Sequence, residues 1–524
     1  MKHIYKAILS IGATFVMFSS CQSALDIEQH GVSTIESFYK TDEDAEQALS
    51  AVYFRLRANF LGMGSDPIFV KTTLSDEIWS GGGNHFDGQA YKFNDYTFEP
   101  DHGTISTLFS NYYQVIYRAN LVINQLADDT PFKKQAIAEA KVIRALEYMD
   151  LILFWGTPRL VDHPLTNDEY LGGNTPTSEL WAFVEKDLNE AISSGALTSK
   201  KNISDQNIYH VTKEYAQALL GKALIFQEKY SEATSVLQSV IDSKKYQLSP
   251  DLYNIWTPEG ENNGESLFDL NVPLDLNNRI STTRWRYIGL RSGKYVNVDN
   301  GKSVPDDTRL TDETWGFANP TKSLYDKFVS VEGADGYRRK CFIATYDELK
   351  SVYNKKIVDG EYVEDNEGFF NAKSRVLAAD WVSNIYPSNI RMMRLAEVYL
   401  LAAEAYFKSG NASKATELVN AIRTRAQAPT ITGNCTFEDI QTESQLELCF
   451  EGMRYENLIR WKTAADVLKD KGAKIPQLYS DGHVEYSDLT YSSTHGFKNG
   501  KHELFPFPVS ETSVNDLMVQ NPGW

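Results

Sequence analysis

Apolar residues recur every three or four positions along much of the chain, which is the spacing of an amphipathic helix. This pattern predicts helices over residues 42–59, 107–126, 133–154, 178–192, 212–228, 230–243, 390–409 and 412–426. A Gly-Thr-Pro sequence follows Trp155 and is expected to end the third helix, because glycine favours helix ends and proline cannot continue a helix. The pattern therefore predicts an all-α fold for most of the chain.

Two pairs of these predicted helices share a spacing of small residues. The fifth and sixth helices carry Gly221 and Ala233, twelve residues apart, and the last two helices carry Ala403 and Ala415 at the same spacing. Small residues at this spacing let antiparallel helices approach closely, as in tetratricopeptide-repeat hairpins. One repeat cannot bury its own apolar face, so at least three are expected, and residues 107–192 are candidates for the others. Chance similarity between two helical hairpins is the alternative.

Two regions interrupt the helical pattern. Residues 62–104, which we call the excursion, are rich in Gly, Asn and Asp, and an irregular stretch of this length tends to be functional. Its aromatic residues include Trp79, Phe86, Tyr91 and Phe93. Residues 244–389, which we call the insertion, have many turn residues, so we expect short strands and loops that fold back onto the helices. The sequence thus predicts a single domain over residues 41–524, with tetratricopeptide-like helices at about 41–243 and 390–470.

The N-terminus has the features of an export signal. Two lysines precede a short apolar segment, and Phe18-Ser19-Ser20 leads to Cys21. Small residues before a cysteine resemble a bacterial lipobox, in which the cysteine is acylated and becomes the mature N-terminus. We therefore expect a signal peptide at 1–20 and a lipidated tether at 21–40, with an ordinary cleaved signal peptide as the alternative. No later stretch is long and apolar enough to span a bilayer.

Composition limits the classes of ligand. The formal net charge is −18, which argues against a polyanionic partner such as nucleic acid. Aromatic residues make up 12% of the chain, and aromatic faces are what the apolar faces of sugars stack on. If Cys21 carries lipid, three cysteines remain, which is no disulfide framework. Cys435 and Cys449 could pair, or Cys449 could be a buried thiol within its apolar run.

Nothing in the sequence predicts catalysis or a metal site. There is no H-E-x-x-H, G-x-S-x-G, P-loop or Rossmann fingerprint, and the histidines have no metal-ligand spacing. Gly81-Gly82-Gly83 lacks the lysine of a phosphate loop, so a flexible turn is expected there. Adjacent carboxylates such as Asp76-Glu77 are expected by chance among 70 acidic residues. A structural calcium site remains open but has no EF-hand spacing to support it.

Four blocks of sequence, with the segment around Cys21, resemble one known family. They read AEAKVIRALEYMDLILFWGTPRL from residue 138, RLAEVYLLAAEA from 394, LELCFEGMRYENLIRW from 446, and LFPFP with QNPGW at the end. In this order they resemble the SusD/RagB family of Bacteroidetes outer-membrane lipoproteins. Met453 replaces the usual His of the family and Phe18 the usual Leu.

These blocks also have a structural interpretation. Glu451, Arg454 and Arg460 are expected to form ion pairs that lock helices together rather than to carry acid–base chemistry. Trp155, Trp461 and Trp524 are expected to be packing residues.

The resemblance implies a SusD-like all-α fold whose ligand site lies where the excursion meets the insertion. Flat aromatic rings with a few amide, carboxylate or guanidinium groups suit sugar ligands. The candidate ligand-binding residues are Asp76, Trp79, Asn84, His85, Trp285, Tyr287 and Trp315. The alternative for each is that it packs a loop against the helices. Arg284, Arg286 and Arg291 could add hydrogen bonds or a preference for anionic sugars.

The resemblance further implies cell-surface binding of a glycan and its delivery to a SusC-like TonB-dependent transporter in the outer membrane, with no catalysis and no cofactor beyond the lipid on Cys21. Two other functions remain open: binding of a peptide or another non-sugar nutrient, and a purely structural assembly role. An exposed row of aromatic rings favours glycan binding, and a deep groove favours the non-sugar ligand. A scaffold predicts no exposed aromatic platform.

Overall fold

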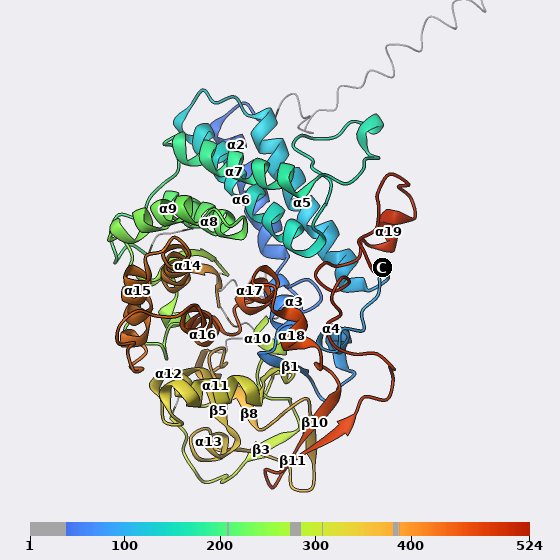
Figure 1. The fold of residues 1–524 in the computed structure, drawn as a ribbon, viewed down its shortest axis with the longest axis vertical. Helices are drawn as coiled ribbons and strands as arrows, with labels where there is room; N and C mark the ends of the chain where they lie inside the picture. Colours follow the sequence, from blue (N-terminus) through green and yellow to red (C-terminus); the bar gives the residue numbers. More distant parts are fainter. Residues whose placement is uncertain (1–37, 207–208, 273–283, 306–307, 381–385, 387) are drawn as a thin grey trace, which may run out of the picture.

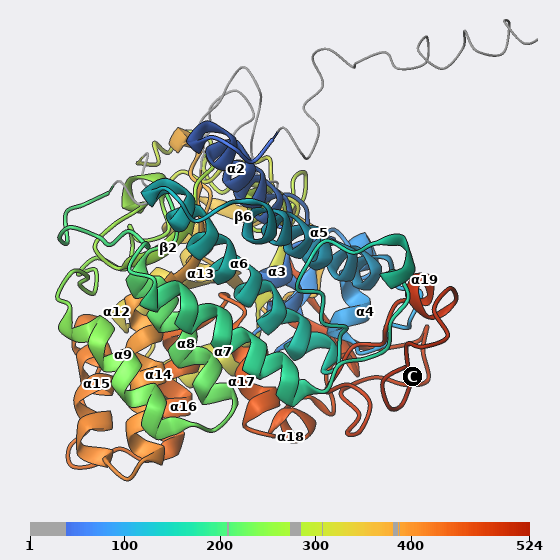
Figure 2. The same ribbon diagram turned by 90° about the horizontal axis from the view of Figure 1, so that it is seen from above.

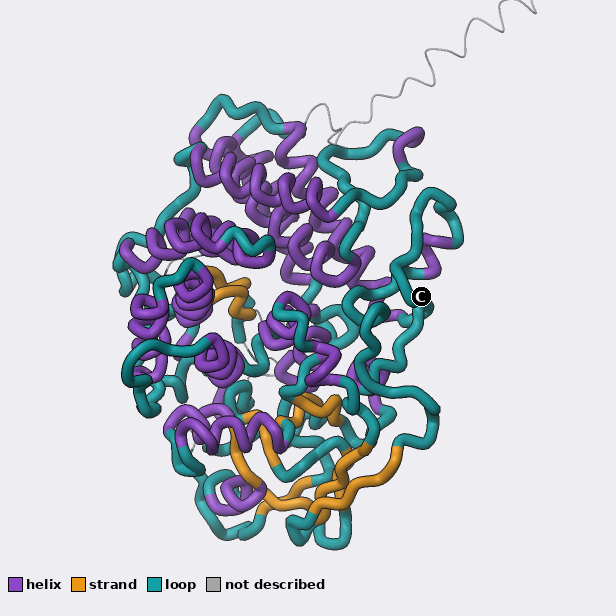
Figure 3. Tube along the Cα trace, in the orientation of Figure 1, coloured by secondary structure: helices purple, strands orange, loops and turns teal. Residues whose placement is uncertain are grey.

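The computed structural model describes residues 38–206, 209–272, 284–305, 308–380, 386 and 388–524. Cys21, the predicted signal peptide and most of the predicted tether lie outside these residues. Helices fill one end of the molecule in Figure 1, and Figure 3 shows the short strands gathered toward the other end. None of the helices in the described part of the chain is long and apolar enough to cross a membrane.

The helices of the first half of the chain pack side by side in sequence order, and the largest hydrophobic core lies between them. They are α2 (Asp42–Ala58), α5 (Gly103–Gln125), α6 (Pro131–Trp155), α7 (Thr177–Ser193), α8 (Lys213–Phe226) and α9 (Tyr230–Asp242). The Thr130 hydroxyl caps the start of α6 by accepting the Lys133 N–H, and Gly156 ends it with a φ of 70°. The periodicity thus predicted these helices to within a few residues.

The second predicted hairpin continues the same stack. It consists of α14 (Leu395–Lys408) and α15 (Ala412–Arg425), and α14 packs against α9, so the two hairpins lie side by side (Figure 2). A Cβ on Gly221 would come within 2.5 Å of the Leu237 side chain, which shows how closely α8 and α9 approach. The prediction of paired helical hairpins with small contact residues is confirmed.

One boundary of this hairpin was predicted wrongly. The predicted helix 390–409 begins only at Leu395, because Ile390–Arg394 forms strand β9. This strand pairs antiparallel with β2 (Ser266–Leu270) of the insertion. Hydrogen bonds to a strand more than a hundred residues earlier therefore override the local helical pattern.

The excursion and the insertion contain short elements rather than loops alone. The excursion holds α3 (Pro67–Leu74), β1 (Ile78–Gly81), η1 (Asp87–Gln89) and α4 (Ala90–Asn94). The insertion adds η3 (Pro258–Gly260), α10 (Arg284–Tyr287), β3 (Tyr295–Asn297), β4 (Phe317–Pro320), α11 (Lys322–Glu332), α12 (Tyr337–Phe342), β5 (Ile343–Thr345), α13 (Tyr346–Ser351), β6 (Lys355–Ile357), β7 (Tyr362–Glu364), β8 (Phe369–Asn371) and η4 (Ala378–Asp380). Its strands pair antiparallel in small sheets, one of which includes β10 (Lys474–Tyr479) and β11 (Val484–Asp488). The predicted short strands are present, and α11–α13 are helices that the weak pattern did not predict.

The C-terminal part of the chain closes over the helices. It contains α16 (Phe437–Leu448), α17 (Met453–Arg460), α18 (Ala464–Leu468) and α19 (Val509–Thr512). A short 3-10 helix from the first half of the chain, η2 (Asn167–Glu169), lies in the loop between α6 and α7. The buried Trp155 indole donates to the Pro506 carbonyl over 2.9 Å. The Trp524 indole donates to the Lys501 and Leu504 carbonyls over 3.1 Å, so both tryptophans pack as expected.

The charged residues of the third family block form the expected ion pairs, but with distant partners. Glu451 accepts from Lys373 over 2.7 Å and from Arg394 over 2.7 and 2.9 Å. Arg454 donates to Asp76 over 2.7 and 2.9 Å. These pairs connect the block to the insertion and the excursion.

The cysteines in the described part of the chain, Cys341, Cys435 and Cys449, are buried and free. Burial raises the pKa of Cys341 to about 11 and that of Cys449 further still, so both remain thiols. The prediction that Cys449 is a buried thiol is confirmed.

Candidate functional site

The excursion and the insertion are joined by a pair of strands. β1 pairs antiparallel with β4, with Trp79 opposite Asn319, and the Gly82 N–H donates to the Gly316 carbonyl over 2.9 Å. We call this contact region the junction. The meeting of the two regions that the resemblance implied is therefore present.

The triglycine run is part of this contact and not a flexible turn. Gly81 and Gly82 have φ values of 80° and 110°, a region that favours glycine. A Cβ on Gly81 would lie 2.4 Å from the Gly316 carbonyl oxygen. The glycines are needed because the two backbones approach so closely here.

His85 holds the junction together from within. Its Nε2 lies 2.8 Å from Asp95 of the excursion and its Nδ1 lies 2.9 Å from Asp365 of the insertion. Burial alone would lower the pKa of His85, but hydrogen bonds to Asp365 and Asp95 raise it to about 10, so the ring is cationic at neutral pH. The sequence placed His85 among the ligand contacts, whereas the structure leaves its side chain 1% exposed with both nitrogens bonded inside the protein.

Tyr287 and Asp76 also bond within the protein. Tyr287 is fully buried and its hydroxyl donates to Asp66, which caps the start of α3. Asp76 is part-buried, which by itself would raise the pKa of its carboxyl, but the Arg454 guanidinium lowers that pKa overall. Both side chains therefore connect the junction to neighbouring parts of the protein. This agrees with the alternative given for each candidate, that it packs a loop against the helices.

Three other candidate ligand-binding residues lie at the junction, Trp79, Trp315 and Asn84, and their side chains differ in exposure. Trp79 and Trp315 are half-buried, and the Trp79 indole Nε1 has no hydrogen-bond partner among the described residues. Asn84 is exposed and donates from Nδ2 to Asp87 over 3.1 Å. Ligand contact by these three residues stays a prediction.

Next to Asn84 lies an exposed group of aromatic rings. The rings of Phe86, Tyr91 and Tyr491 meet edge to face, with centroids 5.3 to 5.4 Å apart in every pair. Phe86 is 50% exposed and Tyr491 is 38% exposed. We call these three residues the aromatic rim. The Tyr491 hydroxyl donates to Asp95 over 2.7 Å, so the carboxylate that holds His85 also positions the rim.

Polar groups suited to hydroxyl ligands flank the aromatic rim. The Phe86 N–H donates to the Asn84 side chain over 3.0 Å, and the Gly83 N–H donates to Asp87 over 2.6 Å. The guanidinium of Arg291, which is partly exposed, lies 3.8 Å from the same Asp87 carboxylate. An amide, a carboxylate and a guanidinium thus lie beside exposed ring faces, a combination that can bind sugars.

Two family models match the chain. One is described as the SusD family and covers residues 344–524, and the other is described as "Starch-binding associating with outer membrane" and covers residues 35–225. The chain belongs to the SusD/RagB family. This result confirms the resemblance drawn from the sequence blocks. The block from residue 138 lies in the second matched range, and the blocks from 394 and 446 and the C-terminal block lie in the first.

Relatives within the SusD/RagB family match most of the chain. SusD-like protein P38 of Formosa agariphila is 26% identical over 88% of this chain and 93% of its own. The starch-binding protein SusD of Bacteroides thetaiotaomicron is 21% identical over 74% of this chain and 72% of its own. Among solved structures, a laminarin-binding SusD-like protein superimposes with a TM-score of 0.77 at 28% identity, covering 93% of this chain and all of that one. The fold is therefore the SusD-like fold.

Sequence reasoning located the junction but chose none of the three rim residues as a ligand contact. Phe86 and Tyr91 belong to the excursion that the sequence singled out, although they were not chosen as ligand contacts. Tyr491 lies about four hundred residues later in a polar loop, and no local pattern distinguishes it. Trp285 is 5% exposed and faces Tyr386 in a separate pocket, so it is not exposed at the junction.

Proposed function

We propose that this SusD/RagB protein binds a glycan at the aromatic rim and acts without catalysis. The observation that carries the proposal is the aromatic rim, in which Phe86 and Tyr491 are exposed and Tyr91 is half-buried. It lies beside the polar side chains of Asn84, Asp87 and Arg291. Exposed rings can stack on the apolar faces of sugars while the polar groups bond their hydroxyls. The rings form an edge-to-face group rather than a row, but Phe86 and Tyr491 are exposed at the surface, which favours glycan binding over a deep peptide groove or a bare scaffold.

Similar proteins support the choice of ligand class. A laminarin-binding protein shares the fold at 28% identity, and surface glycan-binding protein A of Bacteroides thetaiotaomicron, in complex with laminarihexaose, shares the fold with a TM-score of 0.72. We therefore propose a neutral β-glucan such as laminarin as the first ligand to test, with starch as the second because of the starch-binding relative.

The proposal includes a location and a partner. A lipid on Cys21 would anchor the protein in the outer membrane with the domain at the cell surface. From there the protein would pass its ligand to a SusC-like TonB-dependent transporter. The name of the matched family supports the membrane association, and the role requires no cofactor beyond the lipid.

Affinity electrophoresis through gels cast with laminarin, starch or another polysaccharide tests the proposal. We expect laminarin to retard the wild-type protein, and Phe86→Ala or Tyr491→Ala to weaken binding roughly tenfold, as expected for a central contact residue. Phe54→Ala is the matched control, because Phe54 is 57% exposed on α2, which lies outside the junction. Retardation by no glycan, or equal retardation of all variants, would contradict glycan binding at the rim.

A further inference from the structure

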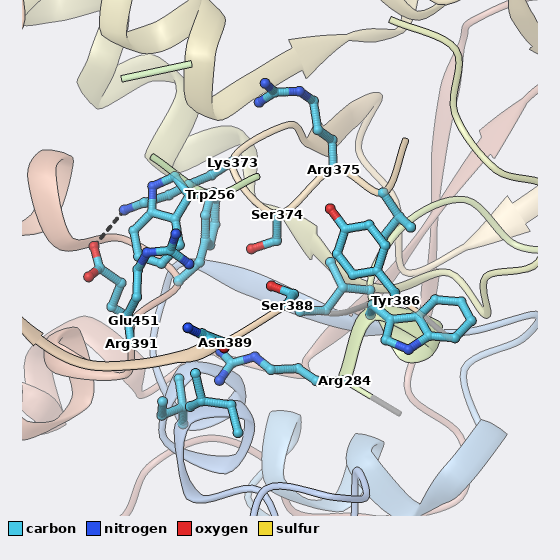
Figure 4. Close-up of a pocket in the computed structure, with 16 residues that line it drawn as sticks. Trp256, Arg284, Lys373, Ser374, Arg375, Tyr386, Ser388, Asn389, Arg391 and Glu451 are labelled. Atoms are coloured by element: carbon cyan, nitrogen blue, oxygen red, sulfur yellow. Dashed lines mark hydrogen bonds and ion pairs between the residues drawn. The ribbon is translucent and has the colours of Figure 1, made fainter. Parts of the chain in front are cut away.

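A second pocket lies where the insertion meets β9, and none of its lining residues belongs to the aromatic rim. In Figure 4, Trp256 and Arg391 lie on one side and Tyr386 on the other, with Ser374, Ser388 and Asn389 between them. Arg284 enters from a third side. The pocket is narrow and partly enclosed by protein, so it suits one small chemical group rather than a flat stacked sugar.

The positively charged side chains around this pocket differ in how far neighbouring carboxylates neutralise them. Lys373 is fully paired, because its Nζ donates to Glu451 over 2.7 Å and to the Glu447 and Cys449 carbonyls. Arg284 lies 3.6 Å from Asp66, but that carboxylate already accepts from the Tyr287 hydroxyl and two backbone N–H groups.

Arg375 and Arg391 form no ion pair with any carboxylate in the described part of the chain. Arg375 donates to the Tyr253 carbonyl over 2.5 Å and is 4% exposed. Arg391 lies 4.9 Å from the Trp256 ring centroid and donates only to the Gly260 carbonyl, over 3.4 Å. Arg375 is buried and Arg391 is half-buried. A guanidinium that is removed from water normally has a counter-ion, since an unpaired buried charge is costly.

The acidic groups near Arg391 compensate it poorly. Burial raises the pKa of Glu261 to about 7 and also raises that of Asp269, although Arg391 acts in the opposite direction on both. Glu261 is therefore incompletely ionised near neutral pH. The positive charge of Arg391 is only partly balanced from within the protein.

The same pocket contains buried hydrogen-bond donors without acceptors. Among the described residues, no partner exists for the Nε atoms of Arg375 and Arg391, the Trp256 Nε1 or the Tyr386 hydroxyl. By contrast, the indoles of Trp155, Trp461 and Trp524 all donate hydrogen bonds. Nearly all buried polar groups in native proteins are bonded, so several orphaned donors around one pocket indicate an acceptor supplied from outside.

We propose that this pocket binds the oxyanion group of an acidic sugar, a carboxylate or a sulfate. Such a group supplies both the negative charge that Arg391 lacks and several acceptor oxygens for the surrounding donors. The proposal rests on the proposed glycan-binding function and extends it, because the rim would hold neutral sugar units while the pocket selects an acidic substituent.

Calorimetry with matched small sugars tests this proposal. The purified protein would be titrated with D-glucuronate, D-glucose 6-sulfate, D-glucose and inorganic sulfate. We expect the two acidic sugars to bind, glucose to bind far more weakly, and added salt to weaken the acidic sugars. Arg391→Gln should weaken both acidic sugars by about tenfold or more, as expected for a lost charge-assisted hydrogen bond.

Controls make each outcome decisive. Arg118→Gln removes an exposed arginine from α5, outside the pocket, and should leave the affinities unchanged. Tyr386→Phe removes one hydroxyl and serves if Arg391→Gln fails to fold. Equal binding of the acidic sugars to wild type and both pocket variants would overturn the proposal. Glucuronate binding that is no tighter than the binding of inorganic sulfate would also overturn it. Laminarin binding that depends on Phe86 would persist in either case, so the two proposals can fail separately.

Discussion

The helical scaffold buries stripes of apolar side chains, whereas the insertion is attached through buried charges from distant parts of the chain. In α5, Ile105, Leu108, Tyr112 and Val115 recur at helical spacing and are almost completely buried. In the insertion, the fully buried Arg338 pairs with Glu443 and Glu447 of α16 over 2.7 and 2.9 Å. The attachment of the insertion therefore adds a buried ion-pair network to the apolar cluster that it shares with the rest of the chain.

This difference has consequences for tolerance to mutation. Apolar burial is non-directional and roughly proportional to area, so the scaffold should accept substitutions that preserve volume. A buried ion pair depends on both partners, and removal of one leaves an uncompensated charge. The attachment of the insertion should therefore be the more fragile of the two.

The largest expected effect is at Glu447. It is fully buried and accepts hydrogen bonds from Arg338, Arg394 and Arg425. Glu447→Ala leaves these three guanidinium groups without this shared partner and should destabilise the protein by about 3–5 kcal/mol in urea unfolding. The matched control is Glu417→Ala, whose side chain is 67% exposed and pairs with Lys414, and which should cost at most about 1 kcal/mol. Similar costs for both variants would remove the contrast between buried and exposed charges.

The next effect depends on pH and concerns His85. Because its folded pKa is raised to about 10, above the usual value of 6.5, its stabilising contribution is fully present below pH 6.5 and is lost as pH rises toward 10. The loss should be on the order of a few kcal/mol. His85→Gln should lower stability at pH 6 and flatten the decline between pH 6.5 and 10, measured by unfolding at several pH values. His483→Gln, which removes a histidine whose side chain is 49% exposed, should preserve the wild-type slope.

The sequence predicted the scaffold well because helical periodicity is local. The helix predicted at 42–59 is Asp42–Ala58 in the structure, and the limits of α6 agree equally closely. The error at 390–394 arose where a partner strand, β2, lies far away in sequence. Local patterns carry no information on such pairings, so the small sheets of the insertion could only be predicted as unspecified short strands.

The candidate site was predicted less completely for the same reason. The family resemblance located the junction, but it did not show that His85 would lie between two carboxylates or that Tyr287 would be buried under Asp66. Tyr491 joins the rim through a hydrogen bond to Asp95, almost four hundred residues away. An aromatic residue in an irregular region gives no sequence signal that separates an exposed ring from a buried one.

A smaller effect tests the scaffold itself. Gly221→Ala places a methyl group within 2.5 Å of Leu237, so α8 and α9 must move apart or Leu237 must change rotamer. Overpacking of this kind should cost about 1–3 kcal/mol in thermal or urea unfolding. Gly103→Ala in α5 is the control, since nothing lies within 4 Å of its Cβ position, and it should change stability by no more than about 0.5 kcal/mol. A neutral Gly221→Ala would show that close approach is not required in this hairpin.

The smallest effect distinguishes local from non-local stabilisation within the scaffold. The Asn411 side chain caps α15 by accepting the Lys414 N–H over 3.1 Å, and this contact spans only three residues. Asn411→Ala should cost about 1 kcal/mol, and Asn411→Asp, which keeps the acceptor and favours the positive end of the helix, should restore most of it. Chemical denaturation of both variants measures this difference. Because the cap lies far from the buried charges, its cost should add to that of Glu447→Ala in the double variant. A clear departure from additivity would show that the hairpin and the attachment of the insertion are coupled, and that the contrast drawn between them is incomplete.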